Sequence, residues 1–379
     1  MKGKKIVLLL LVMVAVTQAF SQAGNAAVLT LINKSEQSFK EKVVSIPWAR
    51  VIAAYPGIDT ANLKIVNAAN RQQINYQLEY AGNASIHQLL VQVNLPPRSE
   101  VKLLLQKAKP LAVATKSYGR FVPERKDDFA WENDKIAFRM YGKALENTPK
   151  ENAYGIDVWV KRTSRMVINE RYKKAEYHVD HGDGLDYYHV GLTLGAGNSM
   201  PYINDSIWYS KNFVGWKLLD NGPLRTTFQL LYDAWQVAGK SVKVTKTISL
   251  DAGSHFNKVV VDYQYEGNEP MPVVVGIIKR PQAGTMLLNE EQGVLGYWEP
   301  AHGADGTTGV ACIIPYPIKS MQVDKTHLFA VTQINKSASF VYYMGAAWNK
   351  AGQITNAQQW FDHINQYRQQ VENGLITTR

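Results

Sequence analysis

Three of the chain's 8 histidines lie within thirteen residues, in the stretch YHVDHGDGLDYYH at positions 177–189. Aspartates and tyrosines fill most of its other positions, and the stretch has no apolar period. Burying so many ionisable groups costs free energy unless each is paired, so the stretch does not fit a core strand. A histidine titrates near neutral pH and can accept or give a proton. The pattern predicts a solvated loop or a functional site, and we favour a site.

Two further clusters of polar and aromatic residues lie far from this stretch in the sequence. The first is YGRFVPERKDDFAWEND, residues 118–134, with Arg120, Glu124, Arg125, Asp127, Asp128, Trp131 and Glu132. The second is YWEPAHGADGTTG, residues 297–309, with Tyr297, Trp298, Glu299, His302 and Asp305. A late segment, MGAAWNKAG, adds Trp348 and Asn349.

Together these clusters are suited to binding a sugar acid. The planar guanidinium of Arg120 or Arg125 can pair with a carboxylate. Glu299 and His302 supply a second acid or base. The rings that can stack on sugars are Trp131, Trp298 and Trp348. The alternative is a set of polar loops at one edge of a sandwich, held by internal ion pairs such as Arg125 with Asp128.

Metal binding and glycoside hydrolysis are further possibilities. His178, Asp180 and His181 have the side-chain types of a divalent-metal site, although their spacing matches no established metal motif. Glu124 or Asp128 together with Glu299 would supply the two carboxylates of a glycoside hydrolase. The chain has no G-x-S-x-G, G-x-G-x-x-G or Walker sequence, which argues against a serine nucleophile and a nucleotide cofactor. No cofactor is indicated with certainty.

The N-terminus has the composition of a secretory signal peptide, residues 1–21. Three lysines precede an apolar run from Ile6 to Val16, and Ala19-Phe20-Ser21 is a small-x-small cleavage pattern. The run is too short to span a bilayer. We therefore expect a periplasmic protein without a membrane span. The single cysteine, Cys312, lies in an apolar run and is predicted to be buried.

The formal net charge is +10, and three of those positive charges lie in the signal peptide. The remaining basic residues are scattered, so nucleic acid is not an expected partner. A mild positive excess suits an acidic oligosaccharide. Nothing in the sequence indicates an oligomeric state.

Strand patterns dominate the chain, and helix is expected only near its end. Runs such as VKVTKTISL and KVVVDYQYEG are rich in β-branched and aromatic residues. Asn221-Gly222 between two apolar arms predicts a hairpin. Residues 356–374 place Trp360, Ile364 and Tyr367 on one helical face. The pattern predicts an all-β fold, a large antiparallel β-sandwich with a short C-terminal helix. Residues 22–112 are expected to form an N-terminal β layer or small module, and residues 113–379 the main domain.

Several long stretches resemble a known family. They include GRFVPERKDDFAWENDKIAFRMYG, YHVDHGDGLDYYHVG, NFVGWKLLDNGPLRTTFQLLYDAW and YWEPAHGADGTTG, and the resemblance covers residues 117–350. They look like a secreted Bacteroidetes family labelled as a domain of unknown function. That family resembles the galactose-mutarotase-like β-supersandwich proteins and is similar to the ulvan oligosaccharide dehydratase of marine bacteria.

The resemblance implies loss of water from a terminal uronic acid of an oligosaccharide, which leaves a 4,5-unsaturated sugar. In this reaction Arg120 or Arg125 would neutralise the carboxylate. His181 is the first choice for the base that takes the C5 proton, and His178 the second. Tyr188 or His302 would help the C4 hydroxyl leave.

Two other classes remain open beside hydrolysis. An aldose epimerase-like enzyme would need a histidine base and an acidic partner, a role that His181 and Glu299 fit. A non-catalytic glycan-binding protein would use the aromatic residues and not the histidines. The fold alone does not choose among these functions.

Overall fold

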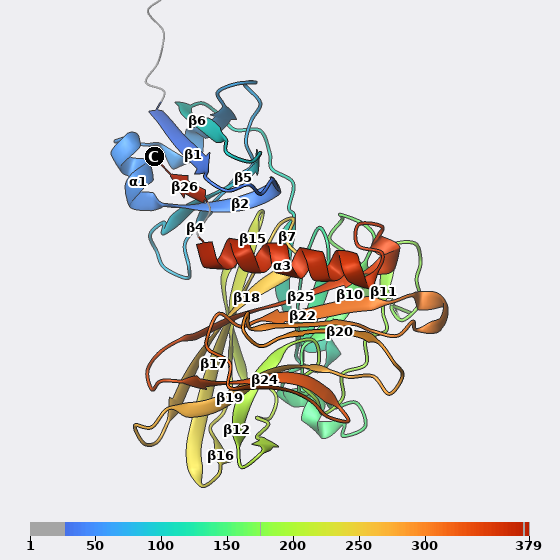
Figure 1. Ribbon diagram of the computed structural model, residues 1–379. Helices are drawn as coiled ribbons and strands as arrows, with labels where there is room; N and C mark the ends of the chain where they lie inside the picture. The colour runs from blue at the N-terminus through green and yellow to red at the C-terminus, as the bar shows by residue number, and fades with distance from the viewer. Residues whose placement is uncertain (1–26, 175, 374–375, 379) are drawn as a thin grey trace, which may run out of the picture.

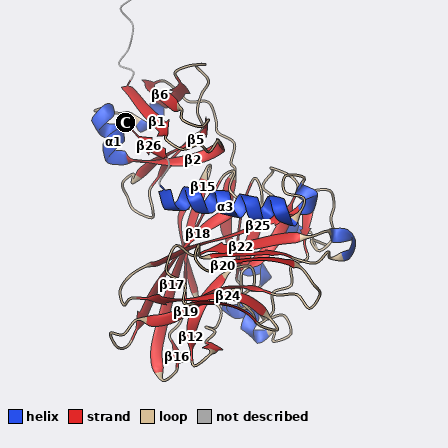
Figure 2. Ribbon diagram, viewed as in Figure 1, coloured by secondary structure: helices blue, strands red, loops and turns tan. Residues whose placement is uncertain are grey.

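The computed structural model describes residues 27–174, 176–373 and 376–378. Strands dominate this part of the chain and pair antiparallel within five sheets, and one long helix lies near the C-terminus (Figure 2). The all-β class and the C-terminal helix predicted from the sequence are confirmed. The predicted signal peptide, residues 1–21, lies outside the described residues.

The first part of the chain forms a small unit with two sheets of its own (Figure 1). The four-stranded sheet has the order β26 (Ile376–Thr378), β1 (Ala27–Asn33), β6 (Glu100–Lys107) and β3 (Leu63–Asn67). The three-stranded sheet has the order β2 (Phe39–Pro47), β5 (Gln88–Leu95) and β4 (Tyr76–Glu79). The helices are α1 (Trp48–Ala54) and the 3-10 turn η1 (Thr60–Asn62). Leu29, Ile46, Val91 and Leu105 lie in a core that belongs to this unit.

The end of the chain returns to this N-terminal unit. β26 pairs with β1, with Thr378 opposite Leu31. The sequence predicts one main domain over residues 113–379, whereas β26 pairs with a strand of the N-terminal unit. A strand of three residues is too short to show a period, so only long-range pairing places it.

Three sheets build the main body. One has the order β11 (Gly184–Asp186), β10 (Asp157–Lys161), β9 (Ala137–Met140), β8 (Asp128–Asn133) and β7 (Ser117–Val122). A second has the order β13 (Ser206–Ile207), β12 (Asn198–Ile203), β19 (Met271–Ile278), β24 (His327–Ile334) and β23 (Ser320–Val323). The largest runs β14 (Gly215–Asn221), β15 (Arg225–Leu231), β17 (Lys240–Asp251), β18 (Phe256–Tyr265), β25 (Phe340–Trp348), β22 (Thr308–Ile313), β21 (Val294–Trp298) and β20 (Thr285–Asn289), with β16 (Trp235–Val237) beside β17.

The largest sheet is the central layer. Strands β7, β8 and β10 pack on one part of it, and β19 and β24 pack on another. Phe129, Phe138, Phe228 and Val275 are among the residues of the continuous core between the layers. This arrangement confirms the predicted large antiparallel sandwich. The Asn221-Gly222 hairpin is also confirmed, as the connection between β14 and β15.

The opposite face of the central sheet is covered by α3 (Ala357–Asn373), drawn in red in Figure 1. In β22, Ala311 and Ile313 point toward α3 whereas Val310 and Cys312 point into the main core, because side chains alternate along a strand. Cys312 is buried, as predicted.

The remaining short helices connect strands of the main body. They are η2 (Pro123–Arg125), η3 (Lys143–Asn147), α2 (Ile168–Lys173), η4 (Gly303–Asp305) and η5 (Asn349–Ala351). Helices α1 and α2 were not expected from the sequence, because a helix of two turns or fewer shows no clear 3.6-residue period. No described helix has the length and hydropathy needed to cross a membrane.

Polar contacts join the N-terminal unit to the main body. The carboxylate of Asp220 accepts hydrogen bonds from the backbone N–H groups of Tyr80 and Ala81, both at 2.7 Å. The guanidinium of Arg225 lies 3.0 Å from the Glu79 carboxylate. Because these contacts engage a turn of one part and a hairpin of the other, they fix the two parts relative to each other.

Candidate active site

The stretch 177–189 combines an exposed loop with a buried edge strand. The side chains of His178, His181 and His189 are exposed, whereas the loop enters β11 at Gly184 and continues into the core. A Cβ atom at Gly184 would lie 2.1 Å from the carbonyl oxygen of Val160, so the close pairing of β11 with β10 requires glycine here. The histidines therefore face solvent beside a rigid sheet edge.

Beneath this loop, four neighbouring strands bring a buried arginine and three aspartates together. Arg139 in β9 has guanidinium nitrogens 2.5 Å from the carboxylate of Asp157, 2.9 Å from that of Asp186 and 3.7 Å from that of Asp128. The hydroxyl of Tyr141 donates to Asp157 at 3.0 Å. We call this group the Arg139 cluster. One cation here faces three carboxyl groups.

The charge imbalance in the Arg139 cluster is reflected in its titration. Burial raises the pKa of Asp128 to about 6, although Arg139 opposes this shift. Burial and the charge of Asp186 raise the pKa of Asp157, again against the effect of Arg139. An ionised carboxylate is costly in a buried site unless it is fully compensated. Asp128 and Asp157 therefore bind a proton at higher pH than exposed aspartates do.

His178 is fixed against this cluster in one tautomer. Its Nδ1 atom lies 2.8 Å from the backbone carbonyl oxygen of Asp186 and 3.8 Å from that residue's carboxylate. A carbonyl oxygen only accepts hydrogen bonds, so Nδ1 carries the proton and Nε2 keeps its lone pair. The side chain is 63% exposed. His178 can therefore take a proton at Nε2, and the positive charge that forms lies beside a carboxylate.

Two arginines that contact Tyr177 and Tyr172 hold N–H groups without hydrogen-bond partners in the described part of the chain. Arg125 donates from Nε to the Tyr177 hydroxyl at 3.4 Å and pairs with Glu151 at 3.5 Å, yet its Nη1 is buried and has no hydrogen-bond partner. The Nε of Arg120 is likewise buried and without a partner. Buried unpaired N–H groups are uncommon in folded proteins. Because these two N–H groups are buried, the outward group for a carboxylate ligand is Nη2 of Arg125, which now pairs with Glu151.

The two arginines share one aromatic surface. The guanidinium of Arg120 lies 5.5 Å from the centre of the Tyr172 ring. Tyr172 contacts Tyr177 and donates its hydroxyl to Asp128 at 3.1 Å. Trp159 lies under both tyrosines, with its ring 5.2 Å from that of Tyr177. The surface of Arg120, Tyr172, Tyr177 and Arg125 thus covers the Arg139 cluster.

A buried ion pair positions the helix that carries Tyr172. Lys161 lies 2.5 Å from the carboxylate of Glu132, and both side chains are fully buried. The other oxygen of Glu132 accepts the backbone N–H groups of Val167 and Ile168 at 2.7 and 2.8 Å. These are donors at the start of α2 that the helix itself cannot satisfy. Glu132 therefore holds α2 against β8.

The second sequence cluster meets the other side of the stretch 177–189. The His302 ring stacks on Tyr187 with ring centres 5.1 Å apart. Arg280 donates to Glu299 at 2.8 Å and to the carbonyl oxygen of His189 at 2.6 Å. Burial raises the pKa of Glu299 to about 7 in spite of Arg280. The structure thus brings both distant clusters to residues 177–189.

Two of the acid–base candidates are less suitable than the sequence suggested. Tyr188 is buried in the core and its hydroxyl has no partner, and burial holds its pKa well above the usual range. It is therefore not a surface proton donor, whereas His302 is exposed. His181 lies on the exposed turn, with Nε2 3.2 Å from the Glu176 carbonyl oxygen. It contacts neither Arg125 nor the Arg139 cluster in the described part of the chain.

The three tryptophans do not form a sugar-binding platform. Trp131 is fully buried and donates to Asn257 at 2.7 Å. Trp348 is buried as well and donates to the Asp305 carbonyl oxygen at 2.8 Å. Trp298 is half-buried and packs toward α3, on the face of β21 opposite Glu299. Core packing occupies the rings of Trp131 and Trp348, so the predicted sugar stacking is corrected for these two, whereas the half-buried Trp298 stays a prediction.

The three residues considered for a metal do not converge. Asp180 accepts the N–H groups of Gly182 and Gly184 and pairs with Arg162 at 2.5 Å, so its carboxylate stabilises the turn. His178 and His181 each contact a different carbonyl oxygen. Among the described residues, no group of three or more histidine, cysteine or acidic side chains is arranged to hold a metal ion.

The carboxylates considered for glycoside hydrolysis are also engaged separately. Glu124 is exposed and pairs with Arg120 at 2.6 Å. Asp128 is fully buried beneath Tyr172, and Glu299 pairs with Arg280. No two of them face each other across an open space, so these contacts do not support a hydrolytic pair.

Sequence reasoning did not single out Tyr177, Tyr172, Arg139 or Asp157. Arg139 and Asp157 lie within the otherwise apolar segments AFRMYG and GIDVWV. A charged residue inside a strand with apolar neighbours on both sides is a signal of a buried charge cluster. That signal was present, although it does not reveal which residues meet.

A protein-family model and a related protein each match most of the chain. The model of the family described as "Domain of unknown function (DUF4861)" matches residues 31–375. "Uncharacterized protein P7" of Formosa agariphila is 33% identical over 309 residues, 76% of each chain.

Two solved structures share the fold. A structure described as an alpha-mannosidase from Enterococcus faecalis V583 has a TM-score of 0.50 at 9% identity and covers 93% of this chain and 46% of that one. One described as a glycosyl hydrolase family 38 protein from the same species has a TM-score of 0.50 at 8% identity, with 93% and 47% covered. The chain thus spans about half the length of these structures.

Proposed function

The chain belongs to the family described as DUF4861, and on that premise we propose that it is a carbohydrate-active enzyme that eliminates water from the terminal uronic acid of an oligosaccharide. One observation carries the proposal. Tyr177 is in contact with both a histidine of fixed tautomer, His178, and a guanidinium with an unpaired N–H group, Arg125. A base beside a carboxylate-binding group is what abstraction of a proton next to a carboxylate requires.

Substrate binding begins with the carboxylate of the uronic acid. The C5 proton is weakly acidic, and it becomes easier to remove when the adjacent carboxylate is neutralised. Arg125 donates from Nη2 to one oxygen of this carboxylate, and Arg120 supplies a second positive charge on the same surface. The exposed Glu151, now 3.5 Å from Arg125, gives way to the ligand.

The chemical step moves one proton and breaks one bond. Nε2 of His178 takes the C5 proton, the electron pair of the C5–H bond forms the C4=C5 double bond, and the C4–O bond breaks. The resulting imidazolium is stabilised by the carboxylate of Asp186. The resemblance made His181 the first choice for this base and His178 the second. We now prefer His178, because its Nδ1 is held by the Asp186 carbonyl oxygen.

The leaving hydroxyl needs a proton to depart as water. Tyr177 is our first choice, because its hydroxyl already accepts from Arg125 at 3.4 Å. His302 is the second choice. Solvent then reprotonates the acid and removes the proton from His178, so the net change is loss of one water from the sugar.

The fold is compatible with this substrate class. It is shared with structures described as glycosidases, but the reaction is argued from the site residues alone. We also propose export to the periplasm, because residues 1–21 have the composition of a signal peptide. Sequencing the N-terminus of protein from the periplasmic fraction tests this: a chain that keeps Met1 would contradict it.

The proposed reaction is tested by incubating the purified protein with a panel of oligosaccharides ending in uronic acid, including ulvan oligosaccharides. A conjugated 4,5-unsaturated uronate absorbs ultraviolet light, and mass spectrometry detects the loss of one water. We expect both signals without chain cleavage. New reducing ends without an unsaturated product would indicate hydrolysis, and a change of sugar configuration without mass change would indicate an epimerase.

A further inference from the structure

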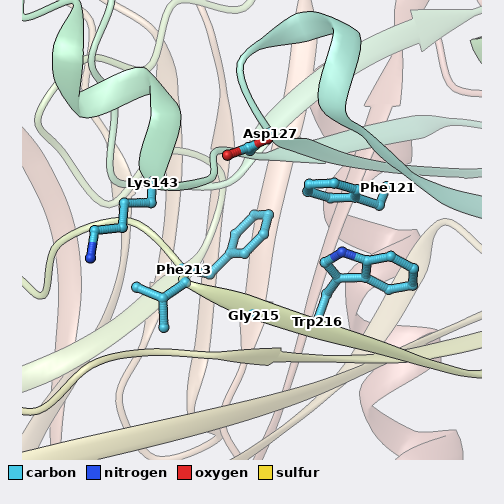
Figure 3. A pocket seen from close by; sticks show the side chains of 7 residues that line it. Phe121, Asp127, Lys143, Phe213, Gly215 and Trp216 are labelled. Carbon is cyan, nitrogen blue, oxygen red and sulfur yellow. The ribbon is translucent and has the colours of Figure 1, made fainter.

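A pocket is lined in part by Asp127, two residues after Arg125 in the chain. Its volume is about 300 Å³, and its walls come from β7, the turn after η2, η3 and β14 (Figure 3). The lining residues are Phe121, Asp127, Lys143, Phe213, Val214, Gly215 and Trp216. Small-molecule pockets begin at about this volume, in a range of roughly 300–1,000 Å³. None of these residues takes part in the proposed elimination.

One wall of the pocket is an exposed aromatic platform. Trp216 is 42% exposed and stacks on Phe121, with ring centres 5.1 Å apart and planes 22° apart. Phe129 contacts the same indole from the core, at 6.0 Å. The indole is therefore held in a fixed orientation with one part open to solvent. A rigid, partly exposed ring suits an amphipathic ligand that offers an apolar face.

The opposite wall carries an acid in a strained backbone conformation. Lys126 and Asp127 have φ angles of +52° and +62°, in the left-handed region that L residues other than glycine seldom adopt. The Asp127 backbone is pressed against Gly142, where a Cβ atom would lie 2.1 Å from its carbonyl oxygen. Strain of this kind persists only where the surroundings impose it. Here it turns the Asp127 side chain to the pocket (Figure 3).

The carboxylate of Asp127 has no hydrogen bond or ion pair with the described part of the chain, although it lies half-buried. The other charged residue of the pocket, Lys143, points away from it in Figure 3 and pairs with Asp233 at 3.4 Å. Asp127 can thus accept two hydrogen bonds from a ligand. Its negative charge disfavours a ligand that itself carries a carboxylate.

We propose that this pocket is a binding subsite for a neutral pyranose ring. The apolar face of the sugar stacks on Trp216, and two neighbouring hydroxyl groups donate to the carboxylate of Asp127. The proposal goes beyond the elimination of water and does not depend on it. Arg125, proposed to bind the uronate carboxylate, and Asp127 are two residues apart in the chain, and Arg125 contacts Tyr177 whereas Asp127 lines the pocket.

The test is binding of the methyl glycosides of glucose, galactose, mannose, xylose and rhamnose, measured by saturation-transfer difference NMR and by titration. The protein carries the His178→Ala substitution, so that catalysis plays no part in the result. We expect at least one glycoside to bind with a dissociation constant in the millimolar range. Trp216→Ala should weaken this binding about tenfold or more. Asp127→Asn should weaken it about fivefold to tenfold.

Asp127→Asn is the decisive variant, because asparagine tolerates a positive φ as well as aspartate does and the fold is therefore retained. Tyr80→Ala removes an exposed aromatic ring of the N-terminal unit, 38% exposed, and should leave binding unchanged. The proposal is overturned if none of the glycosides binds, if uronic acids bind here in preference to neutral sugars, or if binding is the same in both pocket variants. None of these outcomes bears on the proposed elimination, which is measured separately.

Discussion

The Nδ1 atom of His178 lies 2.8 Å from the backbone carbonyl oxygen of Asp186. The contact leaves Nε2 free to accept a proton, so we expect His178→Ala to lower the turnover number by about 100-fold to 10,000-fold. The measurement is the rate of ultraviolet absorbance change on a uronate-ended oligosaccharide. Because this side chain is 63% exposed, the thermal midpoint should stay close to that of the parent protein.

Two other histidine variants make this result specific. His87→Ala changes an exposed histidine of the N-terminal unit and should leave turnover unchanged. His181→Ala decides between the two candidate bases, because both residues lie on the same exposed loop. A loss of turnover in His181→Ala that His178→Ala does not share would transfer the role to His181.

Arg125 should act mainly on substrate affinity. In the proposed reaction its Nη2 exchanges Glu151 for the substrate carboxylate, and a hydrogen bond between charged groups contributes about 1.5–3 kcal/mol. Arg125→Gln should therefore raise KM about 10-fold to 100-fold. Arg125→Lys should recover only part of this, because an ammonium lacks the planar fork.

The Arg125 variants are measured by initial rates over a range of substrate concentrations. Lys126 is the next residue in the chain and also pairs with Glu151, on the exposed side. The variant Lys126→Gln therefore serves as the matched control. An unchanged KM in Arg125→Gln would remove this residue from the substrate site.

The buried pair of Glu132 and Lys161 should matter for stability. Glu132→Gln leaves Lys161 charged and buried without its partner, and we expect the free energy of unfolding to fall by about 3–5 kcal/mol. Urea denaturation followed by circular dichroism measures this. The double variant Glu132→Gln, Lys161→Met should recover part of the loss, because the amide oxygen still accepts the N–H groups that begin α2.

An exposed ion pair provides the comparison for this effect. Arg98 and Glu36 are paired at 2.6 Å with side chains 67% and 75% exposed, so Arg98→Gln should change the free energy of unfolding by less than about 1 kcal/mol. A similarly small effect of Glu132→Gln would mean that Lys161 reaches solvent or loses its proton.

Lys246 should make stability depend on pH. It is buried, contacts Asn198 and lies 5.0 Å from the Tyr232 ring centre, and no carboxylate pairs with it in the described part of the chain. Burial lowers its pKa from 10.5 to about 7. Between these values the unfolded chain binds more protons than the folded one, so the contribution of Lys246 to stability rises with pH from about 7 to about 10.

Lys246→Met removes the cost of burying this amine. We expect it to raise the free energy of unfolding by on the order of 1 kcal/mol or more below about pH 7, with the gain shrinking toward about pH 10. Denaturation at several pH values measures both proteins side by side. An equal gain across the whole pH range would show that Lys246 does not titrate in this window.

Local features of the sequence were enough to predict much of the fold. The alternation of apolar residues predicted the strands, Asn221-Gly222 predicted the hairpin, and the 3.6-residue period of residues 356–374 predicted α3. These signals depend on neighbours in the chain, so they can be read without knowing the rest of the structure. Helices α1 and α2 were not predicted, because each is too short to show a repeated 3.6-residue period.

The candidate site was predicted in part. The density of histidines and aspartates in residues 177–189 predicted a functional site and not a core strand, and the structure shows an exposed loop that runs into the buried edge strand β11. The aromatic residues were misjudged, because the composition of a segment does not tell which face of a strand points inward. Trp131 and Glu299 illustrate this, since each lies in a polar segment and is buried.

The sequence by itself determined the residue types available for chemistry and the strands that carry them. Only the tertiary structure decided which of them meet. Arg139, Asp128, Asp157 and Asp186 come from four strands, and only their order and register in the sheet place them around one guanidinium. The same pairing fixes His178 against the Asp186 carbonyl oxygen. Strand order is set by burial of apolar faces across the whole molecule, a long-range balance that no single segment of the chain contains.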